Sequence, residues 1–281
     1  MISRRDYLTL KEILLTHSGH FLGDGKEYLV VRRLESVPGI LGHPDLAALV
    51  RHLRLTQDPK AVKLVCEAMT TNESLFFRDG RPFDLLRGRV VPDLMEKRRE
   101  RRRLRFWSSA CSTGQEPYSL AMLVADTPEL AGWKVDILAT DYSPRVVERA
   151  REGIFNQFEI HRGLDDALLA RHFEPLDGGR WRVNETLRRA VVFREANLLR
   201  GDRELGTFDL VLCRNVLIYF DQAGKKTVLD RMAEVVPEDG FLLLGASETA
   251  AGVSTHWQAV PGAGTTLFQR SQGTGSELRP G

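Results

Sequence analysis

Residues 105–110 read RFWSSA and run directly into CSTGQEP at residues 111–117. A short apolar run, a turn that contains glycine, and a proline suited to the first turn of a helix predict a buried strand followed by a helix. Comparable apolar runs recur as VDILAT (135–140), FDLVLCRN (208–215) and GFLLLGAS (240–247). Strands that alternate with helices in this way predict an α/β domain built on a doubly wound, Rossmann-like parallel sheet.

The sequence before this sheet has a different character. From Tyr7 to about Met69, apolar residues recur at helical spacing and are interrupted by glycine- and proline-rich breaks. This spacing predicts a bundle of short helices. We therefore expect an N-terminal helical domain over residues 1–70 and a linker over residues 71–103.

The sheet domain is expected to span residues 104–270 and to carry an insertion. LDGG at residues 176–179 precedes the alternating Trp181–Val183, which predicts a small antiparallel β-subdomain inserted at about residues 160–190. The remaining C-terminal sequence predicts a final strand pair from Trp257 to Gln269 and a disordered tail over residues 271–281.

The composition is that of an ordinary soluble globular protein. Of the 281 residues, 42% are hydrophobic and 28% are charged, and no apolar stretch reaches the roughly 20 residues that a membrane-spanning helix needs. The N-terminus does not have the pattern of a signal peptide, because Lys11 and Glu12 interrupt its apolar residues. These features predict a cytoplasmic protein that does not insert into a membrane.

Two further features bear on metals and nucleic acids. Cys66, Cys111 and Cys213 are widely spaced and lack the paired Cys/His spacing of a zinc site, so we expect buried reduced thiols and no metal. The basic run KRRERRRLRF (97–106) is typical of a solvated helix end. A nucleic-acid role for this run is weaker, because no aromatic side chains interleave its arginines.

Ligands of open α/β sheets bind at the carboxyl ends of the strands, so polar residues after each apolar run are the candidates for a site. After the first run only Gly114 is present, which excludes the dinucleotide fingerprint G-x-G-x-x-G. Pro117 in the first turn of the next helix would place Glu116 at the N-cap, a position that glutamate does not favour. Arg214 and Asn215 end a further strand beside the same crevice.

Asp141 closes the second strand, where an acidic side chain is well placed to accept both hydroxyls of a ribose. Its alternative role, a helix cap, is already filled by Ser143 before Pro144. Asn197 follows the apolar Val191–Phe193 and can pair a donor and an acceptor with the edge of adenine. The alternative for Asn197 is a turn asparagine.

Several segments resemble, in order along the chain, the motif set of the CheR family, the chemotaxis receptor glutamate methyltransferases. They are MTTNESLFFRD (69–79), ACSTGQEPYSLAM (110–122), ATDYS (139–143), ANLL (196–199) and RNVLIYFD (214–221). The resemblance covers nearly the whole chain. It implies a protein-glutamate O-methyltransferase that uses S-adenosyl-L-methionine and releases S-adenosyl-L-homocysteine.

The same resemblance implies roles for individual residues. Glu116 would hold the methionine part of the cofactor, and Asp141 would hold the ribose. At the position of Ser74 threonine is common in the family, and the hydroxyl is retained here. The other implied contacts are Asn72, Ser74 and Arg78 from the linker, Asn197 and Leu198 on the adenine side, and Arg214 with Asn215 at the strand end.

Methyl transfer to a glutamate carboxylate needs no general base, because a side chain with a pKa of ~4.3 is already ionised at neutral pH. An enzyme can act by aligning the carboxylate with the methyl group and by excluding water from both. Arg78, with a charged fork, and Tyr219, with a hydroxyl, are the candidates for holding the acceptor. Their alternatives are an interdomain salt bridge for Arg78 and a core aromatic for Tyr219.

The resemblance implies the cytoplasmic methylation helices of chemotaxis receptors as partners, and no nucleic acid. Family members that tether themselves to a receptor's C-terminal pentapeptide resemble one another in a longer loop than residues 176–179 provide, so we expect methylation without a tether. Four basic residues of the N-terminal domain either meet an acidic receptor helix or form a solvated face: Arg32, Arg33, Arg51 and Arg54.

Two other functions compete with this one. The first is an S-adenosylmethionine-dependent RNA methyltransferase, which the basic run favours, and the second is a non-catalytic module that senses the cofactor. An amine methyltransferase of the common type would show Asn/Asp-Pro-Pro-Tyr/Phe after its fourth strand, where this sequence has Asn-Val-Leu-Ile at residues 215–218. A non-catalytic sensor should have lost Arg78 or Asp141, and both are present.

Overall fold

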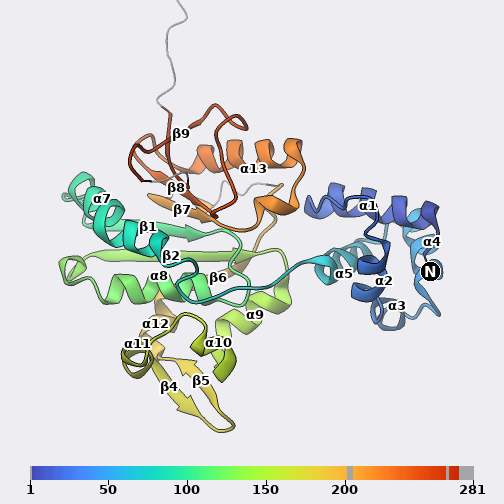
Figure 1. Ribbon diagram of the computed structural model, residues 1–281, viewed down its shortest axis with the longest axis horizontal. Coiled ribbons are helices and arrows are strands. Elements are labelled where there is room, and N and C mark those ends of the chain that lie inside the picture. The colour runs from blue at the N-terminus through green and yellow to red at the C-terminus, as the bar shows by residue number, and fades with distance from the viewer. Residues whose placement is uncertain (1, 201–204, 264–265, 272–281) are drawn as a thin grey trace, which may run out of the picture. The chain divides into compact units, whose positions relative to one another are not determined.

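The computed structural model describes residues 2–200, 205–263 and 266–271. The chain forms two compact units, drawn in Figure 1. Unit 1 runs to Glu73 and includes Leu217–Lys225, and unit 2 consists of Ser74–Val216 and the chain from Lys226 onward. The predicted tail lies outside the described residues except for Ser271.

Unit 1 is the predicted bundle of short helices. In α1, apolar residues three and four apart, such as Leu10, Ile13 and Leu14, face inward and are buried. The helix starts at Ser3, whose side chain accepts the N–H of Asp6, and stops at a left-handed Gly19. The bundle comprises α1 (Arg4–Ser18), α2 (Glu27–Arg33), α3 (Val37–Ile40), α4 (Leu46–Thr56) and α5 (Pro59–Met69).

The segment predicted as a linker is not extended throughout. It contains α6 (Arg81–Leu85), a π-helical turn η1 (Leu86–Val90) and α7 (Val91–Lys97). Their apolar side chains, including Phe83 and Leu86, are buried in the core of unit 2. The second half of residues 71–103 is therefore part of the sheet domain's packing.

The core of unit 2 is a seven-stranded sheet in the order β6-β2-β1-β7-β8-β10-β9. The pairs from β6 to β8 are parallel, and the pairs β8·β10 and β10·β9 are antiparallel. This confirms the predicted α/β fold and the predicted final strand pair. The strands are β1 (Arg103–Ser108), β2 (Lys134–Asp141), β6 (Val191–Glu195), β7 (Leu210–Cys213), β8 (Phe241–Leu244), β9 (Trp257–Ala259) and β10 (Leu267–Arg270).

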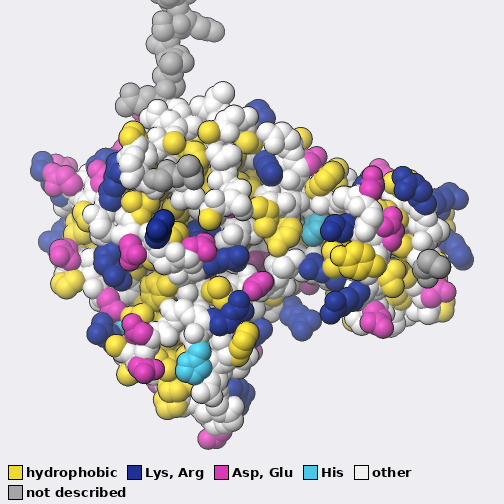
Figure 2. All heavy atoms as spheres, in the orientation of Figure 1, with side chains coloured by type: hydrophobic (Ala, Val, Ile, Leu, Met, Phe, Trp, Pro, Cys, Tyr) yellow, Lys and Arg dark blue, Asp and Glu magenta, His cyan; other side chains and the backbone are white. Residues whose placement is uncertain are grey.

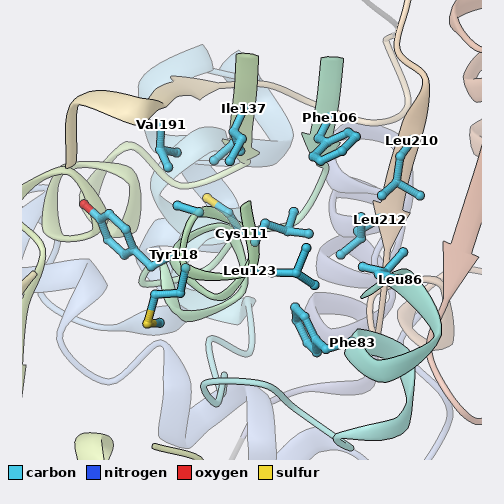
Figure 3. Close-up of a cluster of buried hydrophobic side chains, with 14 of the residues drawn as sticks. Phe83, Leu86, Phe106, Cys111, Tyr118, Leu123, Ile137, Val191, Leu210 and Leu212 are labelled. Carbon is cyan, nitrogen blue, oxygen red and sulfur yellow. The ribbon is translucent and has the colours of Figure 1, made fainter. Parts of the chain in front are cut away.

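Helices cover both faces of this sheet. Strand side chains such as Phe106, Ile137 and Leu212 meet Tyr118 and Leu123 of α8 (Gln115–Ala125) in one apolar cluster (Figure 3). The helices α9 (Pro144–Glu152) and α12 (Glu185–Ala190) and the 3₁₀ turn η2 (Pro128–Leu130) contribute to the same cluster. On the opposite face, β1 meets the helix α13 (Gln222–Val235).

The insertion is a three-stranded antiparallel sheet in the order β3-β5-β4. The predicted hairpin is present as β4 (Phe173–Leu176) and β5 (Arg180–Val183). The additional strand β3 (Ile154–Asn156) starts before the predicted limit, and the sheet is accompanied by α10 (Gln157–His161) and α11 (Asp166–His172). Figure 1 shows β4 and β5 projecting away from the seven-stranded sheet.

The basic run at residues 97–106 is largely neutralised. Arg98 is only 10% exposed and donates through Nε to Asp209 Oδ1 at 2.8 Å. Arg101 Nη2 reaches the same Asp209 oxygen at 2.6 Å, and Arg103 Nη2 lies 2.6 Å from Asp136 Oδ2. The expectation of a solvated helix end was wrong for Arg98, because its guanidinium ties the end of α7 to Asp209, directly before β7. On the face drawn in Figure 2, basic and acidic side chains are interspersed.

Candidate active site

The parallel strands place their carboxyl ends at one edge of the sheet, where the predicted site residues follow. β1 lies between β2 and β7, and β8 flanks β7 on its other side. The loops after these strands therefore meet at a common edge. Within the described residues, no helix is long and apolar enough to cross a membrane.

Gly114 begins helix α8 at this edge. Its φ of 101° is left-handed, and a Cβ there would lie 3.1 Å from the Ala150 side chain and 3.2 Å from the Tyr118 ring. Because Gly114 is the N-cap, Glu116 lies inside the first turn. The predicted N-cap role of Glu116 was therefore wrong, and Pro117 still fits the first turn because the N–H it lacks would have no helical acceptor.

Glu116 is buried and engaged on both carboxylate oxygens. Ser108 Oγ donates to Oε1 at 2.7 Å, and Arg214 Nη1 donates to Oε2 at 3.2 Å. Burial raises the pKa of Glu116, and the Arg214 charge and the Ser108 hydrogen bond oppose that rise. Glu116 thus joins the end of β1 to the end of β7 in a water-excluded position.

Arg214 also fixes the segment that carries Arg78. Its Nη2 donates to the carbonyl oxygen of Arg78 at 2.8 Å and to Asp79 Oδ2 at 2.8 Å. The Arg214 side chain is 1% exposed, and the cofactor contact predicted for it stays a prediction. Arg214 therefore links the buried Glu116 to the backbone of Arg78.

Asp141 ends β2 with both oxygens turned toward neighbouring backbone. Oδ2 accepts the N–H of Ser112 at 2.9 Å, and Oδ1 accepts the N–H of Ser143 at 3.2 Å. Burial raises the pKa of Asp141, while these N–H groups lower it. Ser143 is the N-cap of α9, as expected, but its side chain makes no capping hydrogen bond. A carboxylate oxygen can accept more than one donor, so Asp141 keeps acceptor capacity.

Asn215 follows β7 in a left-handed conformation, with φ of 58°. Its N–H donates to Glu248 Oε2 at 2.7 Å, and the N–H of Gly245 donates to the same oxygen at 2.8 Å. Asn215 Oδ1 is buried and has no hydrogen-bond partner among the described residues. Glu248 was not predicted from the sequence as a site residue. The sequence feature that points to it is its place shortly after the apolar run GFLLLGAS (240–247).

Asn197 and Leu198 follow β6 and line a pocket with Trp107 and residues of α13. Asn197 Oδ1 accepts the N–H of Leu199 at 3.0 Å, the geometry of a turn asparagine. The Asn197 side-chain oxygen, which would accept from adenine in the predicted contact, therefore already accepts a hydrogen bond from its own turn. The contact of Asn197 with adenine stays a prediction.

The remaining predicted site residues divide between the units. Ser74 and Arg78 belong to unit 2, whereas Asn72 and Tyr219 belong to unit 1. Tyr219 lies in the 3₁₀ turn η4 (Leu217–Tyr219), and its ring stacks on His20 with centroids 5.6 Å apart. The roles predicted for these four side chains stay predictions.

The cysteines at this edge are unsuited to nucleophilic catalysis. Burial raises the pKa of the Cys111 and Cys213 thiols well above their usual range. Both thiols therefore stay protonated, and the thiolate is the reactive form. With Cys66 they are free and buried, as predicted.

Comparison with known proteins assigns the chain to a family. A model described as "CheR methyltransferase, all-alpha domain" matches residues 5–70, and one described as "CheR methyltransferase, SAM binding domain" matches residues 72–265. The chain belongs to the CheR methyltransferase family. Its cofactor is S-adenosylmethionine, and it is an enzyme of the methyltransferase class.

Curated CheR relatives align over most of the chain. Chemotaxis protein methyltransferase Cher2 of Pseudomonas putida is 38% identical, over 94% of this chain and 97% of that protein. Chemotaxis protein methyltransferase 1 of Pseudomonas aeruginosa is 40% identical, over 91% and 94%. The chemotaxis protein methyltransferase of Vibrio anguillarum is 36% identical, over 92% and 94%.

The residues at the sheet edge suit this CheR cofactor. S-adenosylmethionine carries an ammonium group, two ribose hydroxyls and an adenine amino group, all of which donate hydrogen bonds. The edge supplies acceptors in Asp141, Glu116 and the unpartnered Asn215 Oδ1. The described residues contain no group of three or more His, Cys, Asp or Glu side chains that could hold a metal ion.

Proposed function

We propose that this protein methylates glutamate side-chain carboxylates on chemotaxis receptors in the cytoplasm, giving glutamyl methyl esters and S-adenosylhomocysteine. The observation that carries the proposal is the match of both CheR domains, in order, over residues 5–70 and 72–265. Relatives that carry the name chemotaxis protein methyltransferase support the receptor as substrate.

Methyl transfer to a carboxylate requires few catalytic groups from the protein. S-adenosylmethionine supplies an electrophilic methyl group, and a glutamate carboxylate is already ionised at neutral pH. The chain must align the acceptor and exclude water, which are effects of proximity and desolvation. The side chains of Glu116 and Asp141 are buried at this edge, so little water reaches them.

We assign the holding of the acceptor to Arg78 and Tyr219. Arginine can bind one carboxylate oxygen with a charged fork, which leaves the other oxygen free to attack. Support for Arg78 comes from its neighbours, because Arg214 fixes the Arg78 carbonyl and the adjacent Asp79 side chain. Support for Tyr219 rests on the family resemblance.

Cofactor contacts are assigned by the same reasoning. Asp141 would hold the ribose, and Glu116 would hold the methionine part. The unpartnered Oδ1 of Asn215 would accept a hydrogen bond from a donor group of the cofactor. The other proposed contacts are Asn72, Ser74 and Arg78, the adenine-side pair Asn197 and Leu198, and Arg214.

The basic residues of unit 1 fall into two groups. Arg33 donates to Thr70 O at 3.0 Å and to Thr71 Oγ1 at 2.8 Å, and Arg54 pairs with Asp6 at 2.7 Å. Arg32 and Arg51 are exposed. We therefore assign the contact with an acidic receptor helix to Arg32 and Arg51 in preference to Arg33 and Arg54.

We infer that the enzyme needs no receptor tether. Only Asp177–Gly179 separate β4 from β5, so the hairpin provides little wall for a bound peptide. Titration of a receptor's C-terminal pentapeptide should give no saturable binding. Saturation at micromolar peptide would show that this edge of the subdomain is a peptide site.

The rival RNA methyltransferase is disfavoured by the ion pairs of Arg98, Arg101 and Arg103. The test is to offer S-adenosylmethionine with either receptor cytoplasmic fragments or total RNA, and to map the methylated sites by mass spectrometry. We expect esters on receptor glutamates and no methylated nucleotide. Methylated RNA with an unmodified receptor would replace our proposal by the rival.

A further inference from the structure

We propose that the inserted β-subdomain positions the Arg78 segment, defined as residues 76–80, and that Gly163 is the positioning residue through which it does so. The inference rests on the proposed role of Arg78 in holding the acceptor. It gives the subdomain a part in the reaction that does not depend on binding a receptor peptide.

The first observation is a backbone contact between the subdomain and the segment. Gly163 follows α10 of the subdomain and has a φ of 122°. A Cβ added there would lie 2.0 Å from the carbonyl oxygen of Phe76 and 2.9 Å from its carbonyl carbon. Because the obstructing atoms are backbone, no side-chain rotation relieves the overlap. Any residue other than glycine must displace the segment or the subdomain.

The second observation is that Phe76 is anchored among aromatic residues of the subdomain. Its side chain is 1% exposed. Its ring packs edge-to-face on Phe155 of β3, with centroids 4.9 Å apart, and on Phe173 of β4, at 5.5 Å. Edge-to-face pairs of this kind fix relative orientation as well as burying area. The subdomain therefore packs around the side chain of Phe76 and approaches its carbonyl closely at Gly163.

The third observation is that the backbone between Phe76 and Arg78 is tightly constrained. Phe77 and Asp79, on either side of Arg78, have φ of 46° and 70°. Such conformations are disfavoured for residues with side chains and persist only where the surroundings impose them. The N–H of Phe77 donates to Ser119 Oγ at 2.9 Å, and Gly80 N–H donates to Phe77 O at 2.8 Å.

These contacts make a short mechanical connection. The subdomain fixes Phe76, helix α8 fixes Phe77 through Ser119, and Arg214 fixes Arg78 and Asp79. A displacement at the Phe76 carbonyl must therefore be absorbed within two residues of Arg78. Misalignment of the Arg78 side chain should slow methyl transfer, because the enzyme acts mainly by positioning the acceptor.

The test compares Gly163→Ala with Gly178→Ala in the full-length protein. Gly178 is a matched control, because it lies in the same subdomain, has a φ of 73°, and has nothing within 4 Å of an added Cβ. Three quantities are measured: hydrogen exchange of the amides at residues 77–80, the single-turnover rate on a receptor fragment lacking its C-terminal pentapeptide, and the affinity for S-adenosylhomocysteine.

We expect Gly163→Ala to accelerate exchange at residues 77–80 and to lower the single-turnover rate about 10- to 100-fold, with a smaller change in affinity. Gly178→Ala should leave all three quantities near wild type. If Gly163→Ala does not fold, Phe76→Leu, which keeps an apolar side chain but loses the edge-to-face contacts, should give the same pattern.

Two results would overturn the inference. One is unchanged exchange at residues 77–80 in a folded Gly163→Ala protein. The other is accelerated exchange with a wild-type transfer rate. The proposed role of Arg78 is tested separately by Arg78→Ala, and a normal rate there would remove that role while leaving the exchange result to stand by itself.

Discussion

Asp141 illustrates how a single side chain is prepared for a ligand before the ligand arrives. Its two oxygens accept the N–H groups of Ser112 and Ser143, which fixes the carboxylate at the end of β2. The side chain is buried, so its charge is poorly hydrated and favours further donors. Ribose hydroxyls are donors of the required kind.

Replacing Asp141 with alanine should weaken binding of S-adenosylhomocysteine by about 1.5–3 kcal/mol, the range for hydrogen bonds to a charged group. Titration calorimetry measures this directly. Asp136→Ala is the matched control, because Asp136 lies on the same strand but pairs with Arg103 at 2.6 Å. Unchanged affinity in a folded Asp141→Ala protein would remove Asp141 from the ribose site.

The pKa of Glu116, raised by burial, predicts that cofactor binding depends on pH. Donors on the ligand favour the ionised carboxylate and lower its pKa in the complex. Between the lower bound-state pKa and the raised free-state pKa, binding releases a proton, so affinity should fall as the pH falls through that interval. Calorimetry in buffers of different ionisation enthalpy should detect that proton.

Glu116→Gln should remove part of the proton release while leaving the contribution of Asp141, whose pKa burial also raises. Affinity that is constant across this pH range would contradict the placement of these carboxylates at the cofactor.

At this scale the sequence was informative where a polar residue follows an apolar run, as for Asp141 and Asn215. It failed for Glu116, because the left-handed Gly114 starts the helix two residues earlier than expected. It missed Glu248, whose bond to Asn215 exists only because β7 and β8 are neighbours in the sheet.

At the scale of elements, the start of α8 is a position where an added side chain should destabilise the fold. Gly114→Ala adds a Cβ at φ of 101° and brings it within 3.1 Å of the Ala150 side chain. We expect a loss of about 1–3 kcal/mol in the free energy of unfolding, measured by urea denaturation.

Gly252→Ala is the control for that loss, since Gly252 has a φ of 75° but nothing within 4 Å of an added Cβ. A loss no larger at Gly114 than at Gly252 would mean that the close approach to Ala150 is unimportant for stability.

The buried strands could be predicted because they are short, apolar and bounded by turns, as β1, β2, β7 and β8 confirm. β3 could not, because Ile154–Asn156 is too short to show alternation and acquires its identity by pairing with β5. The helices of residues 81–97 are hard to predict, because they are short and are interrupted by the π-helical turn η1.

At the scale of the whole molecule, the division into units does not follow the order of the chain. Leu217–Lys225 belongs with the N-terminal helices, where Phe21 N–H donates to Tyr219 O at 2.7 Å. Residues nearly two hundred positions apart meet there, and no local pattern announces such a contact. The sequence around Tyr219 therefore predicts only a part of the sheet domain.

We propose that this CheR protein transfers a methyl group to a carboxylate on a chemotaxis receptor. The most direct measurement incubates the protein with methyl-labelled S-adenosylmethionine and receptor cytoplasmic fragments, and then treats the isolated receptor with alkali. We expect label on the receptor that alkali releases as methanol, because a glutamyl methyl ester is base-labile. Arg78→Ala should lower the rate of labelling more than it lowers cofactor affinity. An unlabelled receptor, or label that resists alkali, would exclude methyl transfer to a receptor carboxylate.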